Sequence, residues 1–312
     1  MKILEYLFLF LIFPGFLFSA SIGLFAGWID RKLTARVQWR KGPPWYQNFI
    51  DVIKLLFIKE TVIPRNVSKI IFLGAPLLSL ASITLVSTII LVINGSPQSG
   101  FLGDLIIVVY LLMIPAISLM LGAFASENPL ASLGASREMK LMMSYELPFI
   151  ISILVPIIKS GYAIKVGDII MHQSAYGHVI GSASGVISFI VMLLCAQAKL
   201  GFAPFDIPEA ETEIMAGPYI EYSGKALGIF KLSKAVMLFA LPVLMIILYF
   251  GGIIFNAEAF VKSIIQYMLI LVLLVVIKNT NPRVRIDQAM KFFWGPVTIL
   301  AVFSVALAYL GY

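Results

Sequence analysis

Apolar runs recur along the chain and are separated by short polar segments. Each run has about 20 residues, which is enough for a helix to cross the hydrocarbon core of a bilayer. The runs are continuous rather than alternating, which disfavours a transmembrane β-barrel. The pattern predicts an all-α polytopic membrane protein with eight spanning helices, at about 3–28, 70–93, 104–125, 139–158, 183–201, 234–255, 262–280 and 289–310.

The first apolar run has the outline of a signal peptide, with Lys2 ahead of it and small residues near Ser19–Ser21. It is too long for a typical signal peptide and ends in the charged sequence Asp30-Arg31-Lys32. We therefore interpret it as the first spanning helix. No soluble domain and no internal repeat is evident, so residues 1–312 are predicted to form a single membrane domain.

The long polar segment 29–69 contains a second kind of helix signal. Pro43-Pro44 can open a helix, because proline suits the first helical turn. An apolar stripe at helical spacing follows, which predicts an amphipathic helix lying at the membrane interface. This helix could be a simple lipid anchor or a platform for a soluble partner; the stripe consists of Trp45, Phe49, Val52, Ile53 and Leu56.

The distribution of charged residues predicts how the chain is oriented in the membrane. Only 12% of the residues are charged, against roughly 25% in soluble domains. The net charge of +7 alone could suggest nucleic-acid binding, but the basic residues follow the topology. With the N-terminus outside, 19 of the 23 Lys and Arg residues fall on the inner side. Both termini are then predicted outside the cell membrane, and the basic and acid-rich loops in the cytoplasm.

The sequence offers few ligands for a metal ion or a redox cofactor. Cys195 is the single cysteine, so the chain's own thiols cannot form a disulfide, a zinc site or an iron–sulfur cluster. His172 and His178 are the two histidines, and both are expected to be solvated in an outer loop rather than to bind metal. Neither a P-loop nor a His-Glu-x-x-His motif is present.

The segment Phe202–Gly224 is the most unusual stretch, because it is rich in acids and lies between two apolar runs. Three prolines divide it, so we expect short helical pieces and turns rather than one helix. Its carboxylates have to be solvated, paired with cations or placed along a wet pathway. They belong to Asp206, Glu209, Glu211, Glu213 and Glu221, and the predicted acid-rich inner loop spans residues 202–233.

Three of these acids are closely spaced. If Pro208 opens a helix, Glu209, Glu211 and Glu213 fall in its first turns, where the helix dipole favours carboxylates. Glu209 and Glu213 would then share a face, and close carboxylates can hold a shared proton. The alternative is ordinary N-terminal charges neutralised by nearby Lys and Arg.

Glu146 is the acid placed deepest in a predicted span. It lies eight residues after Glu138, or about 12 Å farther along a helix. A carboxylate there costs a few kcal/mol unless it is paired, wetted or protonated, and Pro148 can loosen the backbone and admit water. Glu146 is therefore a candidate proton or ion site, with a structural interhelix hydrogen bond as the alternative.

Four motifs in order resemble one known family. They are DRK…R.Q.RKGPP…D..K….KE from Asp30 to Glu60, G..RE……SYELP from Gly134 to Pro148, PFDIPEAETEIMAG…EYSG from Pro204 to Gly224, and NPR.R.DQ.M….W from Asn281 to Trp294. Together they resemble the H-type, or heel, membrane subunit of respiratory complex I and of energy-converting membrane-bound NiFe hydrogenases.

The resemblance implies eight spanning helices and a membrane subunit of a multisubunit oxidoreductase. Such a subunit anchors a soluble arm and couples its redox chemistry to H⁺ or Na⁺ translocation through antiporter-like membrane subunits. It implies no catalytic centre or cofactor in this chain. The NiFe centre and the iron–sulfur clusters are expected in the large and small partner subunits on the inner face.

The resemblance also implies residue roles. The ion pathway is predicted to use Glu138, Glu146, Asp206, Glu209, Glu211, Glu213 and Glu221. Docking of the arm is predicted to use Arg31, Lys32, Arg36, Arg40, Lys41, Arg137, Arg283, Arg285 and Asp287.

One departure from the family pattern bears on the substrate. Quinone-reducing members usually carry an acidic residue and an arginine where this chain has Lys199 and Phe202. Their loss argues against a quinone site and favours the hydrogenase branch, with a quinone-chamber subunit or a related sulfur-reducing complex as alternatives. A stand-alone transporter and a purely structural anchor are further hypotheses. The missing internal repeat counts against the transporter.

Overall fold

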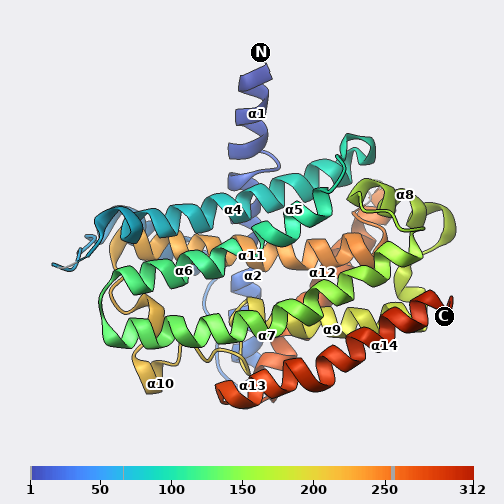
Figure 1. Cartoon of the computed structure of the whole chain (residues 1–312). Helices are drawn as coiled ribbons and strands as arrows, with labels where there is room; N and C mark the ends of the chain where they lie inside the picture. The colour runs from blue at the N-terminus through green and yellow to red at the C-terminus, as the bar shows by residue number, and fades with distance from the viewer. Residues whose placement is uncertain (1, 66, 254–256) are drawn as a thin grey trace.

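The computed structural model describes residues 2–65, 67–253 and 257–312, and within these ranges it contains helices and turns but no strand (Figure 1). Among the described residues, seven helical stretches are long and apolar enough to span a membrane, and a shorter apolar helix adds an eighth. All eight predicted spans therefore have a counterpart. The helices are α1 (Lys2–Leu11) with α2 (Phe16–Val37), α4 (Lys69–Gly95), α5 (Asp104–Leu111) with α6 (Ile114–Ala125), α7 (Pro129–Lys159), α9 (Ala183–Lys199), α11 (Gly224–Phe250), α12 (Ala257–Thr280), and α13 (Ile286–Phe292) with α14 (Thr298–Tyr309).

Helix α11 is the centre of the bundle. In its most apolar window 89% of the residues are buried, against 28% in the windows of α2, α12 and α14. It packs against α2 and α4, while α7, α9 and α14 form a second group that α6 joins to α4. Figure 1 shows α1 and α2 running across the direction of the other long helices. A helix that is apolar all round is expected at such a central position.

Two helices extend well beyond their predicted spans. Helix α2 continues to Val37, so Arg31, Lys32 and Arg36 lie in its last turns rather than in a loop. Helix α11 begins at Gly224 rather than near residue 234. Polar residues at the ends of these helices obscured the boundaries, because hydropathy marks only the part of a helix that matches the hydrocarbon core.

Helix α7 differs from the predicted fourth span at its start. It begins at Pro129, about ten residues early, because Asn128 caps it and accepts a hydrogen bond from the Leu130 amide at 2.9 Å. It also continues through Pro148 and Pro156 without interruption. Pro156 leaves the Ser152 carbonyl without its helical donor. That oxygen instead accepts hydrogen bonds from Ser188 Oγ at 2.7 Å and Tyr249 Oη at 3.2 Å.

The predicted amphipathic helix is present as α3 (Gln47–Ile53), which continues into a π-helical turn, Lys54–Ile58. Its buried residues are Asn48, Val52 and Leu55, whereas Trp45 and Ile53 of the predicted stripe are exposed. Asn48 Nδ2 donates to the Leu24 carbonyl at 3.0 Å, which fastens α3 to α2. The buried face is thus rotated from the predicted one, because packing on α2 and α11 selects it.

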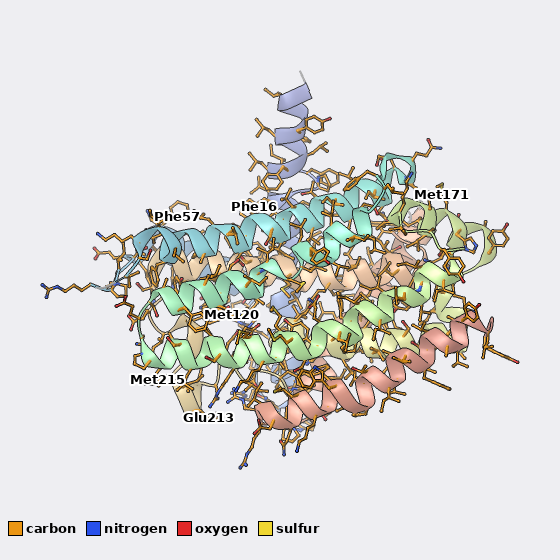
Figure 2. All side chains as sticks on the ribbon, viewed as in Figure 1. Phe16, Phe57, Met120, Met171, Glu213 and Met215 are labelled. Atoms are coloured by element: carbon orange, nitrogen blue, oxygen red, sulfur yellow. The ribbon has the colours of Figure 1, made fainter. Side chains whose placement is uncertain are left out.

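The two ends of the bundle differ. The end that carries α10 (Glu211–Ile214) and the segment Phe202–Gly224 is called the acidic-loop end. The opposite end carries α8 (Val166–Tyr176), a helix inside the predicted outer loop, and is called the α8 end. Figure 2 shows Glu213 and Met215 at the acidic-loop end and Met171 at the α8 end.

Candidate functional site

The segment Phe202–Gly224 folds as short helical pieces and turns, as predicted: α10 and a single 3-10 turn, Gly217–Tyr219. Pro208 does not open a helix, so the condition for a shared face of Glu209 and Glu213 is not met. Helix α10 begins at Glu211, and its N-cap is Ala210, without a side-chain cap. Glu209 therefore lies outside the helix and does not share a face with Glu213. The proposed shared proton between these two carboxylates loses its geometric basis, because each has a different cationic partner.

Helix α7 brings this segment close to the membrane helices. A Cβ on Gly134 would lie 2.5 Å from Pro218 Cδ and 2.9 Å from Gly217 Cα, so only glycine allows this approach. Glu138 lies one turn farther along α7 and on the same face. The glycine thus places the Gly217–Tyr219 turn beside Glu138.

Two buried side chains of opposite charge meet between α7 and α9. Lys199 Nζ lies 2.6 Å from Glu146 Oε2, and the side chains are 1% and 9% exposed. The ammonium also lies 5.0 Å from the Tyr145 ring centroid and 4.6 Å from that of Phe149. Lys199 is in the last turn of α9, where the helix dipole favours a cation. Glu146 is therefore paired inside the membrane region rather than isolated.

A small pocket lies next to this pair; its lining is largely apolar, and it is called the polar pocket for the charged side chains on its wall. Its volume is about 50 Å³, and Glu138, Lys199, Glu209, Tyr219 and Lys234 are among the residues that line it. Glu209 accepts two hydrogen bonds from Lys234 Nζ, at 2.7 and 2.9 Å. Glu138 interacts electrostatically with Glu209, Lys234 and Lys199. The pocket therefore joins the acidic segment to ionisable groups of α7, α9 and α11.

Tyr219 at this pocket keeps its hydroxyl proton across the physiological pH range. Burial, followed by the negative charges of Glu209 and Glu138, raises the pKa of its hydroxyl well above the ordinary value. The phenol therefore stays protonated.

Asp206, at the start of the acidic segment, forms a two-pronged ion pair with Arg283. Arg283 Nε and Nη2 lie 2.8 and 2.7 Å from the two carboxylate oxygens of Asp206. These hydrogen bonds raise the pKa of the Arg283 guanidinium above its ordinary value. Val284 N also donates to the Pro204 carbonyl at 3.2 Å. The predicted arm-docking residue Arg283 thus fastens the acidic segment to the loop between α12 and α13.

The remaining acids of the segment lie nearer the surface. Glu213 Oε2 lies 2.6 Å from Arg137 Nη1, and this hydrogen bond and charge lower the pKa of Glu213. Glu221 Oε1 accepts from Asn128 Nδ2 at 2.5 Å. Glu211 is exposed. The predicted acids are therefore divided among several places, and the structure brings only Glu138 and Glu209 to one pocket.

Most of the predicted docking residues form an exposed polar surface at the acidic-loop end. Arg31 is exposed and pairs with Asp51 at 3.0 Å, and Arg40 donates to Gln38. Lys32 is half-buried. The other exposed members are Arg36, Arg40, Lys41, Arg285 and Asp287.

Sequence reasoning missed three cations that organise this end: Lys199 as the partner of Glu146, Lys234 as the partner of Glu209, and Lys278. Lys278 Nζ lies 2.8 Å from Asp30 Oδ2 and 4.5 Å from the Phe202 ring centroid. Each of these lysines lies in or borders an apolar run. A charge in that position was the available signal, since it needs a partner.

In the part of the chain that the structure describes, no group of three or more His, Cys, Asp and Glu residues is arranged to hold a metal ion. Cys195 is buried, and His172 stacks on Tyr176 with ring centroids 4.6 Å apart.

Fold and site together define a multi-pass helical membrane protein whose ion pairs, among the described residues, are concentrated at one end. The chain matches the family described as NADH dehydrogenase over residues 9–309 and belongs to it. It is an H-type membrane subunit of the complex I and membrane-bound hydrogenase superfamily.

Relatives in this family share both sequence and length. The H-type subunit of the NADH-quinone oxidoreductase of Geobacillus sp. (strain WCH70) is 32% identical over 295 residues, covering 89% of this chain and 86% of the relative. The corresponding protein of Anoxybacillus flavithermus (strain DSM 21510 / WK1) is also 32% identical, with the same coverage.

A solved structure shares the fold. It is a chain of the membrane-bound sulfane sulfur reductase, an archaeal respiratory membrane complex. The TM-score is 0.84 at 27% identity, covering 94% of this chain and 96% of that chain.

Proposed function

We propose that this chain anchors a soluble NiFe-hydrogenase-like arm and couples electron transfer there to H⁺ or Na⁺ movement into antiporter-like membrane subunits. The observation that supports the proposal best is the polar pocket between Glu138 and Glu209, which adjoins the buried Lys199–Glu146 pair. Ionisable groups inside membrane helices are costly to maintain and mark ion paths.

The chain's own role is conduction and docking rather than redox catalysis. The arm would carry the NiFe centre and the iron–sulfur clusters, and its charge changes would act on Glu213, Glu211 and Glu209 in the exposed part of the acidic segment. Glu209 and Glu138 would pass the change inward through the pocket. The exposed basic residues Arg36, Arg40, Lys41 and Arg285 would face the arm on the cytoplasmic side.

A sulfur-reducing complex is a second candidate, and the likeness to the sulfane sulfur reductase chain favours it. The quinone alternative is favoured by the NADH-quinone oxidoreductase relatives, but two positions of this chain count against it. Lys199 is engaged by Glu146, and Phe202 is covered by the Lys278 ammonium, so neither of these positions presents a group to a quinone headgroup. Three electron acceptors are thus to be distinguished: protons, sulfur compounds and quinone. Identifying the co-purifying subunits and testing whether turnover depends on quinone distinguishes them.

The coupling role is tested by Glu209→Gln in the assembled complex. We expect ion translocation per electron to fall while redox turnover of the arm continues, because the amide cannot bind and release a proton or form an ion pair with Lys234. Glu127→Gln is a matched control, since Glu127 is an exposed carboxylate at the same end. Normal translocation in Glu209→Gln would contradict the proposed pathway.

A further inference from the structure

Glu138 and Glu146 lie on the same helix but in different electrostatic surroundings. Glu146 has a cation 2.6 Å away, inside a site closed by two aromatic rings. For Glu138, no ion pair within 4 Å occurs among the described residues, and its carboxylate borders the polar pocket. The two carboxylates are therefore unequal candidates for binding and releasing a proton.

The titratable groups that interact with Glu138 come from four parts of the chain: the acidic segment, α7, α9 and α11. They are Glu209 of the acidic segment, Lys199 of α9, Lys234 of α11, Tyr219 of the 3-10 turn and Tyr145 of α7 itself. Both lysines are already committed to other carboxylates, Lys199 to Glu146 and Lys234 to Glu209. Glu138 is thus the carboxylate at this pocket without a cation of its own.

The pocket also gives Glu138 a route for a proton. Its volume of about 50 Å³ is enough for a few water molecules, because one water needs roughly 10–15 Å³ of such space. Glu209 and Lys234 are about one-third exposed, so the pocket adjoins solvent at the acidic segment. Glu146 does not line this pocket, although Lys199 does.

We propose that Lys199 is a positioning residue that keeps Glu146 ionised, so that the exchangeable proton of this membrane site is held at Glu138. The inference rests on the proposed coupling function and gives the two carboxylates, Glu146 and Glu138, different roles in it. Lys199 Nζ and Glu146 Oε2 form a buried ion pair 2.6 Å apart, in which each charge is balanced by the other. The neighbouring carboxylate, left without a cation, changes its protonation with the state of Glu209 and the acidic segment.

The test compares four variants in the assembled complex: Glu138→Gln, Glu146→Gln, Lys199→Met and the double variant E146Q/K199M. Ion translocation per electron is measured together with the infrared carboxylic-acid band that changes with the redox state of the arm. Only preparations that retain their partner subunits are compared. Glu127→Gln is the control for an exposed carboxylate at the same end.

We expect Glu138→Gln to lose both the band and translocation while redox turnover continues. Lys199→Met leaves Glu146 without its cation, so the proton moves to Glu146 and translocation is lost. Adding E146Q removes that competing acid, and the double variant regains both translocation and the band. If Lys199→Met does not assemble, the double variant and Glu138→Gln still decide the question.

The inference is overturned if Glu138→Gln keeps the band while Glu146→Gln loses it, an outcome that leaves the coupling function intact. It is equally overturned if an assembled double variant lacks translocation. Normal translocation in all four variants would instead remove the coupling function itself.

Discussion

The two ends of the bundle hold their helices together by different chemistry. At the acidic-loop end, ion pairs join separate elements, with Glu146–Lys199, Glu209–Lys234 and Asp206–Arg283 as the main examples. At the α8 end, no ion pair within 4 Å joins the described elements, and neutral amides together with one buried carboxylate, Asp104, which accepts from the Val166 amide at 2.9 Å, hold them through hydrogen bonds. Gln173 Nε2 donates to the carbonyls of Ile247 and Leu248, both at 3.1 Å.

Asn94 has the same role as Gln173 at the α8 end. Its Nδ2 donates to the Ile253 carbonyl at 2.8 Å, and its Oδ1 accepts from the Ile253 amide at 2.7 Å. Amide clips of this kind satisfy backbone groups near the membrane without charge. The described part of the α8 end thus shows that fastening helices does not need ion pairs. Holding helices together therefore does not explain why the acidic-loop end uses ion pairs. The proposed coupling function explains it.

The largest expected effect comes from breaking the buried ion pair. Glu146→Gln leaves the Lys199 ammonium buried without its anion, which costs about 3–5 kcal/mol. Thermal denaturation of the purified complex measures this loss. The double variant E146Q/K199M should be clearly more stable than Glu146→Gln alone. Equal losses in both would show that packing, not charge, sets the cost.

A smaller effect is expected from the neutral clip at the α8 end. Gln173→Met keeps the volume but leaves the Ile247 and Leu248 carbonyls without this donor, at a cost of about 1–3 kcal/mol. Ion translocation per electron should stay normal in the surviving complex. A translocation defect in Gln173→Met would break the contrast between the two ends.

The smallest effect concerns the surface pair Arg137–Glu213, and it depends on pH. The hydrogen bond from Arg137 and its charge lower the pKa of Glu213 in the folded chain. The pair therefore stabilises fully above the ordinary glutamate value of 4.5 and is lost as the pH falls below it. The difference in melting temperature between the native chain and Glu213→Gln should shrink over that acidic range and with added salt. A constant difference would exclude the pair as its source.

The general architecture was predictable from hydropathy, and the family from four motifs. The helix ends at Pro129 and Gly224 were not, because polar residues beyond the apolar runs are helical as well. The Asn128-Pro129 pair was a readable cap signal that hydropathy alone passes over. The face of α3 was also missed, since its contacts with α2 and α11, rather than its own periodicity, choose the buried side.

The sequence by itself determined that this chain crosses a membrane and that its acids gather between spans. Apolar runs and charges are local properties, so they can be read in one dimension. Tertiary structure alone decided the pairing. Glu209 pairs with Lys234 and Glu213 with Arg137, so these two acids are separated. Lys199 pairs with Glu146, and Glu138 lines the polar pocket. Partners such as Lys199 and Glu146 are 53 residues apart, and only the packing of α7 on α9 brings them together.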